Sequence, residues 1–151
     1  MTSLRPPRED ELPALSALCL RSKAHWGYDE AFMSACVEEL TLTPDVLTAS
    51  HLQLAEDEHG HIGVAQIAMI DDTTASLEIL FIEPERIGTG AGKLLFQWAT
   101  EQARDLGAKS LMIEGDPDAA PFYRHMGAYD VGEAPSGSIP GRMLPLLRLD
   151  L

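Results

Sequence analysis

The fold is decided by the stretch Leu77-Glu78-Ile79-Leu80-Phe81-Ile82-Glu83-Pro84-Glu85-Arg86-Ile87-Gly88-Thr89-Gly90-Ala91-Gly92-Lys93. An apolar run followed by glycines and then by a helical pattern predicts a buried strand, a turn and the start of a helix. A helix N-terminus presents unpaired N–H groups and the positive end of a dipole, which together favour a phosphate. Glycines at 88, 90 and 92 permit close approach of a ligand, and Lys93 adds a positive charge. A turn that needs glycine only for packing is the alternative.

Two common phosphate motifs do not fit this stretch. The Walker A pattern requires Gly and Ser or Thr at places that hold Ile87 and Leu94. The dinucleotide fingerprint G-x-G-x-x-G meets Lys93 when it starts at Gly88, and Leu95 when it starts at Gly90. The sequence therefore disfavours a kinase-type P-loop and a Rossmann dinucleotide site.

The glycine-rich stretch resembles the pyrophosphate loop of the GNAT superfamily of acetyl-CoA-dependent N-acetyltransferases. In that family a strand is followed by Pro, two residues and Arg-Gly-x-Gly-x-Gly/Ala; this chain matches at Pro84 and the three glycines and departs at Ile87. A second stretch, from Asp116 to Ala128, resembles the family pattern Asn-x-x-Ala-x-x-Phe-Tyr-x-x-x-Gly-Phe. The two motifs and the helix between them cover residues 77 to 128, about a third of the chain.

The resemblance implies acetyl-CoA as cosubstrate and no metal. It also implies that a bulge separates the strand before the loop from its neighbour and frees N–H groups around Phe81 and Ile82 for the pantetheine arm and the thioester carbonyl. The residues expected to bind acetyl-CoA are Phe81, Ile82, Ile87, Gly88, Thr89, Gly90, Ala91, Gly92, Lys93, Asp116, Ala119 and Phe122.

Acetyl transfer to an amine needs a base for the amine and a proton for the departing thiolate. The resemblance places Tyr123 beside the thioester, where its phenol can protonate the thiolate; the alternative is an aromatic that only packs the helix. Glu78 interrupts an apolar strand and shares a face with Leu80 and Ile82 if the alternation is regular, so desolvation would raise its pKa toward that of a base. The alternative is that the Glu78 carboxylate only forms a hydrogen bond with a neighbouring hydroxyl or with solvent, and that ordered water is the base.

Asp116 occupies the place of the usual Asn, whose amide faces the pantetheine, but an ionised carboxylate only accepts hydrogen bonds. A cap on the following helix is therefore an equal alternative. For the acceptor we expect contacts from His25, Trp26 and Tyr28, at the corner between two helices, although these residues also suit a hydrophobic staple. Arg142 is either a binding group for a substrate carboxylate or an ordinary surface residue.

Composition sets further bounds. The 151 residues are 45% hydrophobic and suit one domain, residues 1–151. A net charge of −13 disfavours nucleic acid as a partner and weakly favours a cation. No 18-residue apolar run or apolar leader is present, so we expect no membrane partner and a cytoplasmic location. Cys19 and Cys36 are expected to be buried thiols, and His59-x-His61 is expected to be solvated rather than a metal site.

The pattern along the chain predicts an α/β layout. We expect strands near 3–5, 51–56, 62–70, 76–83 and 109–114 and two more after Tyr129, with helices near 9–25, 29–40, 90–106 and 118–126. This corresponds to a GNAT-like fold: a mixed, mostly antiparallel sheet of six to seven strands flanked by about four helices, parallel only beside the long helix.

The sequence thus predicts an acyltransferase that moves the acetyl group of acetyl-CoA to a primary amine, in a ternary complex. The acceptor is expected to be a small-molecule amine or a peptide amine, and a homodimer is left open. A non-catalytic acyl-CoA-binding or sensing module is the main rival. A nucleotide-dependent phosphotransferase is disfavoured by Leu94, which stands where Ser or Thr is needed.

Overall fold

The computed structural model describes all residues from 1 to 151. One seven-stranded sheet has the order β1-β2-β3-β4-β5-β7-β6. Only β4 and β5 are parallel, and every other neighbouring pair is antiparallel. The strands are β1 (Ser3–Arg5), β2 (His51–Asp57), β3 (Gly60–Met69), β4 (Thr74–Ile82), β5 (Ser110–Glu114), β6 (Tyr129–Pro135) and β7 (Met143–Asp150).

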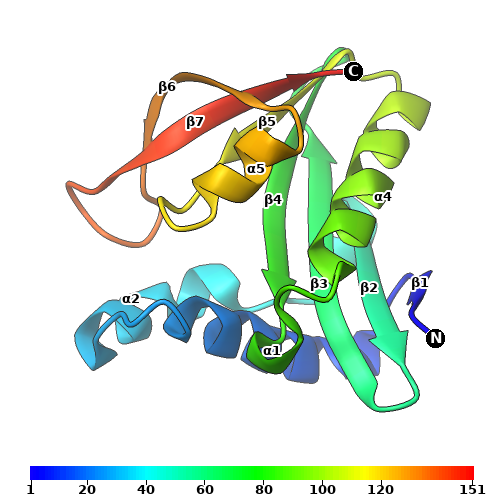
Figure 1. Cartoon of the computed structure of the whole chain (residues 1–151), viewed down its shortest axis with the longest axis vertical. Helices are drawn as coiled ribbons and strands as arrows, with labels where there is room; N and C mark the ends of the chain where they lie inside the picture. Colours follow the sequence, from blue (N-terminus) through cyan, green and yellow to red (C-terminus); the bar gives the residue numbers. More distant parts are fainter.

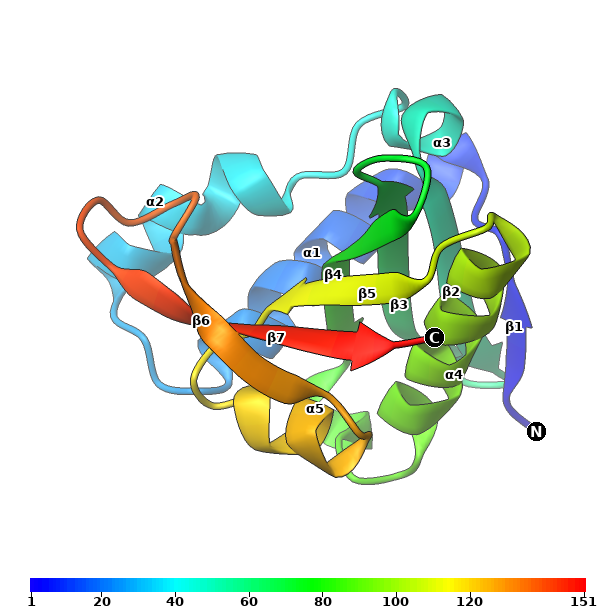
Figure 2. The same cartoon turned by 90° about the horizontal axis from the view of Figure 1, so that it is seen from above.

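The helices lie on both faces of this sheet. They are α1 (Leu12–Ala24), α2 (Glu30–Leu40), α3 (Val46–Ala49), α4 (Ala91–Asp105) and α5 (Ala120–His125), with 3-10 turns η1 (Glu9–Glu11) and η2 (Pro84–Arg86). Seen from above, α1 and α2 lie on one side of the sheet and α4 and α5 on the other (Figure 2). The predicted fold class, with its seven strands and single parallel pair, is confirmed; the four-residue helix α3 was not anticipated.

Local sequence explains where the helices begin and end. Asp29 caps α2 by accepting a hydrogen bond from the Phe32 N–H at 2.8 Å. Helix α4 ends before Gly107, whose φ of +93° is the left-handed conformation that suits a residue just past a helix. Cys19 and Cys36 are both buried and free, as expected, and pack into one apolar cluster between α1, α2 and the sheet.

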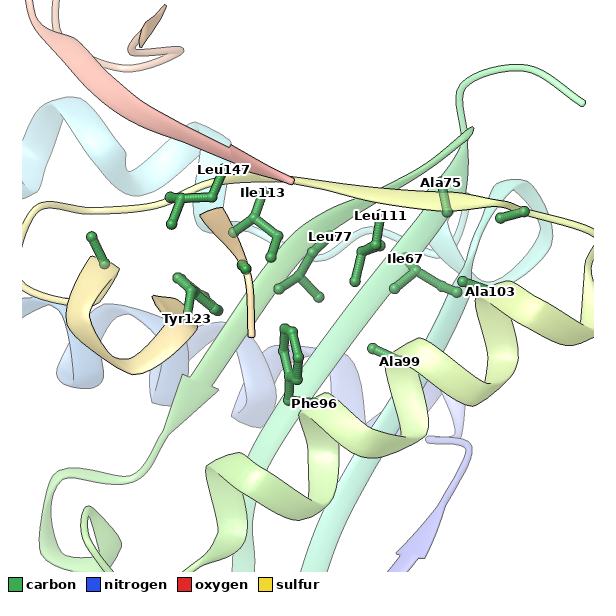
Figure 3. Close-up of a cluster of buried hydrophobic side chains, with 13 residues drawn as sticks. Ile67, Ala75, Leu77, Phe96, Ala99, Ala103, Leu111, Ile113, Tyr123 and Leu147 are labelled. Carbon is green, nitrogen blue, oxygen red and sulfur yellow. The ribbon is translucent and has the colours of Figure 1, made fainter. Parts of the chain in front are cut away.

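The largest apolar cluster joins α4 and α5 to the other face of the sheet. Phe96, Ala99 and Ala103 of α4 face strand residues such as Leu77 and Leu111, and all of these side chains are buried (Figure 3). Burial of such side chains contributes roughly 1.5 to 3 kcal/mol each for the large ones. Tyr123 of α5 lies in the same cluster, so the core and the predicted site share a residue.

A β-bulge interrupts β4 at Glu78. Gln66 of β3 pairs with Ile79 and Ile67 pairs with Leu77, so Glu78 is one extra residue on β4. Leu77 and Leu80 consequently contact the same α4-side cluster although they are three positions apart, whereas Ile79 packs toward α1 and α2. The regular alternation that grouped Glu78 with Leu80 and Ile82 therefore does not hold across the bulge.

The ladder between β4 and β5 ends close to the bulge. Its pairs run from Thr74 with Ser110 to Leu77 with Ile113, and residues 78–82 of β4 have no partner on β5. Figure 1 shows the two strands diverging from the top of the molecule, with β5, β7 and β6 leaning away from the upright strands β2, β3 and β4. This separation opens the sheet on the side where the glycine-rich turn and α5 meet.

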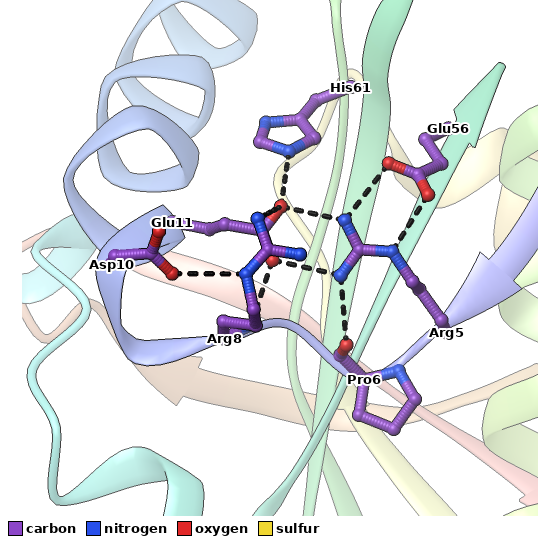
Figure 4. A network of polar contacts seen from close by, with 7 residues as sticks. All are labelled: Arg5, Pro6, Arg8, Asp10, Glu11, Glu56 and His61. Atoms are coloured by element: carbon purple, nitrogen blue, oxygen red, sulfur yellow. Dashed lines mark hydrogen bonds and ion pairs between the residues drawn. The ribbon is translucent and has the colours of Figure 1, made fainter. Parts of the chain in front are cut away.

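A polar network ties the N-terminal strand to the sheet (Figure 4). Arg5 donates two hydrogen bonds of 2.8 Å to Glu11 and also contacts Glu56 at 2.7 Å. His61 lies 2.9 Å from Glu11 and is only 25% exposed, so the expectation that both histidines of the 59–61 pair are solvated is wrong for His61. Glu11, Glu56 and His61 lie close enough to hold a metal, but Arg5 already occupies both carboxylates.

We predict that Glu11→Gln lowers stability and weakens its dependence on acid. The bonds from Arg5 hold the pKa of Glu11 well below its usual range. A carboxyl with a lowered folded pKa stabilises the protein above its unfolded pKa, near 4.3, and this stabilisation is lost as the pH falls through the folded pKa. Hydrogen bonds to a charged group suggest a Tm lower by roughly 5 °C at pH 7 and a shallower decline below about pH 4.

Thermal unfolding of the wild type and the variant from pH 7 to pH 3 measures both effects. Glu9→Gln is the matched control, because Glu9 lies in the same turn, is exposed and makes no side-chain hydrogen bond. Equal Tm values for the two variants at every pH would contradict the prediction.

Candidate active site

A cleft of about 890 Å³ follows the separation between β4 and β5. Its size lies near the upper end of ordinary ligand pockets. The walls come from the end of α1, from α2, from β4, from the glycine-rich turn and from the segment between β5 and α5. Predicted site residues that line it are Trp26, Glu78, Phe81, Ile82, Ile87, Gly88, Gly90, Gly92, Lys93, Asp116, Ala119, Phe122 and Tyr123.

The glycine-rich turn presents bare backbone to the cleft. Gly88 and Gly90 have φ values of +85° and +94°, and no heavy atom lies within 4 Å of the position of a Cβ at either residue. Gly90 is the N-cap of α4 and supplies no capping side chain. The first amides of α4 are therefore available to an outside acceptor. Lys93 is exposed beside them, so the turn has the geometry and charge of an anion site.

Arg86 does not replace the arginine missing at position 87. Its guanidinium donates to Asp57 in the β2–β3 hairpin at 2.6 Å, which holds the pKa of Asp57 below its usual range. Ile87 is 39% exposed at the rim of the cleft. Thr89, which does not line the cleft, donates its hydroxyl to the Arg86 carbonyl at 2.6 Å. The groups that this turn offers to an anion are thus backbone amides and Lys93, with no arginine among them.

The two sequence motifs meet in space. Phe122 packs on the first turn of α4, where a Cβ added to Gly92 would lie 3.6 Å from the Phe122 ring. Phe122 also contacts Phe96 and Tyr123 edge-on, with ring centroids 6.0 and 5.4 Å apart. Ala91 is buried below the turn and does not line the cleft. The glycine turn and α5 therefore form one continuous wall.

The backbone of β4 offers amides on its open side. The Glu83 N–H donates to the Ile62 carbonyl at 2.7 Å, and bonded pairs recur at every second residue of an antiparallel ladder. Phe81 therefore faces Val64 in a bonded pair, while the amides of Leu80 and Ile82 point toward the side that β5 has left. We expected free amides at Phe81 and Ile82, but the strand pairing leaves those of Leu80 and Ile82 free instead.

Tyr123 combines a buried ring with a hydroxyl that reaches the cleft. The residue is only 6% exposed and lies in the core cluster, yet it lines the cleft. Its hydroxyl has no protein hydrogen-bond partner and is not among the fully enclosed polar atoms. Burial raises the pKa of Tyr123, with a smaller contribution from Asp116, so the phenol stays protonated at neutral pH. This is the state that a proton donor requires.

Glu78 stands at the bulge and is exposed to the cleft. Desolvation by the neighbouring walls raises the pKa of its carboxyl, and the charge of Glu114 adds to this, while a hydrogen bond with Ser76 opposes it. The direction agrees with the expected shift toward a base, and no cation forms an ion pair with Glu78. Glu114, Ser76 and Glu39 also line the cleft and were not identified from the sequence.

Asp116 connects two of the four predicted acceptor-site residues, Tyr28 and Arg142, with the start of α5. Its Oδ1 accepts the Asp118 N–H at 3.0 Å, so it shapes the turn, but the N-cap of α5 is Ala119. Its Oδ2 accepts the Tyr28 hydroxyl at 2.6 Å. Burial alone would raise the pKa of Asp116, but the bonds from Tyr28 and Asp118 and the charge of Lys23 lower it, so the group is ionised.

Arg142 is not an ordinary surface arginine. It donates to the Tyr28 hydroxyl at 2.9 Å, and its side chain is 19% exposed. At the same corner Trp26 lines the cleft, whereas His25 is exposed and packs edge-on against Trp26 at 5.2 Å between ring centroids. The structure therefore brings Tyr28 and Arg142 to Asp116 at the end of the cleft, but neither they nor His25 line the cleft themselves.

Residues 18–128 match the sequence model of the Acetyltransferase (GNAT) family. The chain belongs to this family. Membership identifies it as an acyltransferase of the acetyltransferase class, in agreement with the prediction from the two motifs. No curated protein matches the chain, and no helix of this acetyltransferase combines the length and apolar character needed to cross a membrane.

Solved structures of GNAT proteins share the fold along the whole chain. A GCN5-related N-acetyltransferase from Rhodopseudomonas palustris is 18% identical, with a TM-score of 0.82 and coverage of 100% of this chain and 96% of that one. The PaiA N-acetyltransferase from Thermoplasma acidophilum, solved with coenzyme A, is 16% identical, with a TM-score of 0.81 and coverage of 100% and 99%. A ribosomal-protein-alanine N-acetyltransferase from Brucella melitensis is 19% identical, with a TM-score of 0.68 and coverage of 99% of each chain.

Proposed function

We propose that this acetyltransferase moves the acetyl group of acetyl-CoA directly to a primary amine bound in the same cleft. The observation that carries the proposal is the convergence of bare amides at Gly88 to Gly92, the open amides of β4 and the unpartnered Tyr123 hydroxyl on one cavity. Acetyl-CoA supplies an activated thioester and an anionic pyrophosphate. The glycine turn fits the pyrophosphate. The space beside Gly88 and Gly90, which a Cβ would occupy in any other residue, is open, so a phosphate can approach the backbone there.

The remaining chemistry is assigned to side chains and amides of this chain. Glu78 accepts a proton from the ammonium form of the acceptor, directly or through water, so that the amine lone pair is free to attack the thioester carbon. The N–H groups of Leu80 and Ile82 donate to the carbonyl oxygen as negative charge develops on it. Tyr123 donates its proton to the sulfur as the carbon–sulfur bond breaks. As the amide forms, the nitrogen loses its second proton, which returns the Tyr123 phenolate to the phenol. The products are the amide, the free thiol of CoA and one proton on Glu78.

A non-catalytic acyl-CoA sensor is the second candidate, but one feature argues against it. A binding module needs the glycine turn and has no need of a hydroxyl that is held at a cleft by a buried ring without a partner in the protein. The structural neighbour that acts on ribosomal-protein alanine supports a peptide amine as one acceptor class beside small amines. Release of free thiol from acetyl-CoA, measured with a panel of small amines and peptide N-termini, tests enzyme against sensor.

We predict that Gly90→Val lowers the affinity for acetyl-CoA by more than tenfold. A β-branched side chain at φ +94° would occupy the approach to the backbone amides. In the wild type acetyl-CoA should raise Tm, whereas ATP and NAD should not, because neither of their motifs is present. Titration by calorimetry or thermal shift measures the loss.

Gly60→Val is the matched control for backbone strain. Gly60 has a φ of +118°, open space around its Cβ position and a place in the β2–β3 hairpin away from the cleft. Unchanged acetyl-CoA affinity in Gly90→Val, or an equal loss in both variants, would place the pyrophosphate elsewhere.

We predict that Tyr123→Phe lowers kcat by about two orders of magnitude, since a general acid contributes about 10² to 10⁴-fold. The change removes one hydroxyl and little volume, so acetyl-CoA binding should change by less than about 1 kcal/mol. Steady-state thiol release and a binding titration separate the two quantities. A variant that turns over at the wild-type rate would show that another group protonates the thiolate.

We predict that Glu78→Gln removes an acidic limb from the pH profile of kcat/KM. The base acts when ionised, so wild-type activity should rise as the pH increases through the Glu78 pKa, which lies above the usual glutamate value. Glu114→Gln is the comparison variant: it removes a repelling charge, so the limb should move to lower pH and remain. If Glu78→Gln keeps the limb, ordered water or another group is the base.

A further inference from the structure

Two cations share one carboxylate at the end of the cleft. Lys23 Nζ, in the last turn of α1, lies 3.3 Å from Asp116 Oδ2, and Arg142 Nη2, between β6 and β7, lies 3.5 Å from the same oxygen. The three side chains are only 15 to 19% exposed. The group therefore keeps a net positive charge in a chain that has 11 basic and 24 acidic residues.

An aromatic pair holds these cations in place. The rings of Tyr28 and Phe32 are stacked with centroids 4.0 Å apart. Arg142 Cζ lies 4.9 Å from the Phe32 centroid, and Lys23 Nζ lies 5.5 Å from that of Tyr28. The Tyr28 hydroxyl also donates a hydrogen bond to Asp116 and accepts one from Arg142, so both side chains fix its position. Preorganised charges of this kind suit recognition of a ligand rather than general solubility.

Lys23 has hydrogen-bonding capacity that the protein does not use. It lines the cleft and makes one hydrogen bond, to Asp116, although an ammonium group has three N–H donors. An anion is the ligand that matches a cation with free donors. Asp116, unlike the Asn usual at this place of the motif, supplies the negative charge that brings Lys23 and Arg142 together.

The opposite charge lies nearby in the same cleft. Glu78 and Glu114 both line it, and neither forms an ion pair with a basic residue. Glu114 precedes Asp116 by two residues, so their Cα atoms are at most about 7 Å apart. A small molecule that carries both an ammonium and a carboxylate matches the acidic and the basic side chains that line this one cleft.

We propose that the acceptor is an amino carboxylate, whose carboxylate is bound by Lys23 and whose amine is directed toward Glu78. Asp116 is then a positioning residue that holds Lys23 and Arg142 at the cleft. The inference rests on the proposed acetyl transfer and names the substrate class of that same site. The acidic side of the cleft alone would also suit a diamine, and the experiment is chosen to separate the two.

The test compares L-amino acids with their own carboxamides, and with putrescine, as acceptors for acetyl-CoA. The wild type should prefer each acid over its amide by about 10- to 100-fold in kcat/KM, the range expected for a charge-assisted hydrogen bond. In Lys23→Met this ratio should fall close to one, while the KM for acetyl-CoA stays within about threefold because the anion site at the glycine turn is intact. Lys109→Met, an equal change at an exposed residue outside the cleft, should retain the wild-type ratio.

Asp116→Asn tests the positioning role. Its side-chain oxygen can still accept the Asp118 N–H, but the charge that holds the cations is lost. The acid-to-amide ratio of kcat/KM should therefore fall, a readout that a role of Asp116 confined to the turn before α5 would not change.

Equal or better use of amides or putrescine by the wild type would overturn the inference. An acid-to-amide ratio that is the same in Lys23→Met as in the wild type would also overturn it. So would a Lys23→Met variant that differs from the wild type only by a higher KM for acetyl-CoA, because Lys23 would then bind the cosubstrate. Transfer without a carboxylate preference overturns this inference alone. Absence of transfer to every amine, despite tight acetyl-CoA binding, overturns the proposed function together with it.

Discussion

The ladder between β4 and β5 ends at Leu77 and Ile113, and the functional geometry of the chain depends on that end. Parallel neighbours normally stay paired over their whole length, because an unpaired N–H in the interior is costly. Here one extra residue, Glu78, changes the course of β4, and the two strands separate. The amides thus left open face a cleft instead of a partner strand.

The separation is tolerated because side-chain packing supports both halves of the sheet. Helix α4 and the apolar cluster around Phe96 cover one face across both halves, and α5 contributes Tyr123 to the same cluster. On the other face α1 and α2 pack on β2, β3 and β4. The Ser138 hydroxyl, between β6 and β7, donates to Glu39 of α2 and connects the halves across the cleft. Packing therefore fixes the width of the opening without strand pairing.

Charge is distributed along this opening according to the chemistry proposed for it. Bare amides and Lys93 mark the phosphate end, and unpaired carboxylates lie at the bulge. The cation pair around Asp116 closes the remaining end. A protein with a net charge of −13 would repel an anionic cosubstrate at most of its surface. Local backbone dipoles and the basic residues Lys23 and Lys93 in the cleft offset that repulsion where binding has to occur.

The sequence by itself determined the strands, the glycine turn and the family of the fold. Alternating and helical periodicities are local properties, and glycine at 88 and 90 is required by backbone angles that other residues rarely adopt. The pKa of Glu78 is raised in the direction predicted from the sequence, but the cause is desolvation by the cleft walls and not a face shared with Leu80 and Ile82.

Only the tertiary structure decided which groups meet. The family resemblance implied a bulge in this strand, but its place at Glu78 follows from the pairing of β3 with β4, and no residue pattern within β4 signals it. The contact of Lys23 and Arg142 with Asp116 joins positions that are 93 and 26 residues apart from it in sequence. His61 and Arg86 likewise found partners in distant segments, Glu11 and Asp57. Such pairings depend on how the chain packs as a whole, and local sequence contains no information about the separation of two side chains in space.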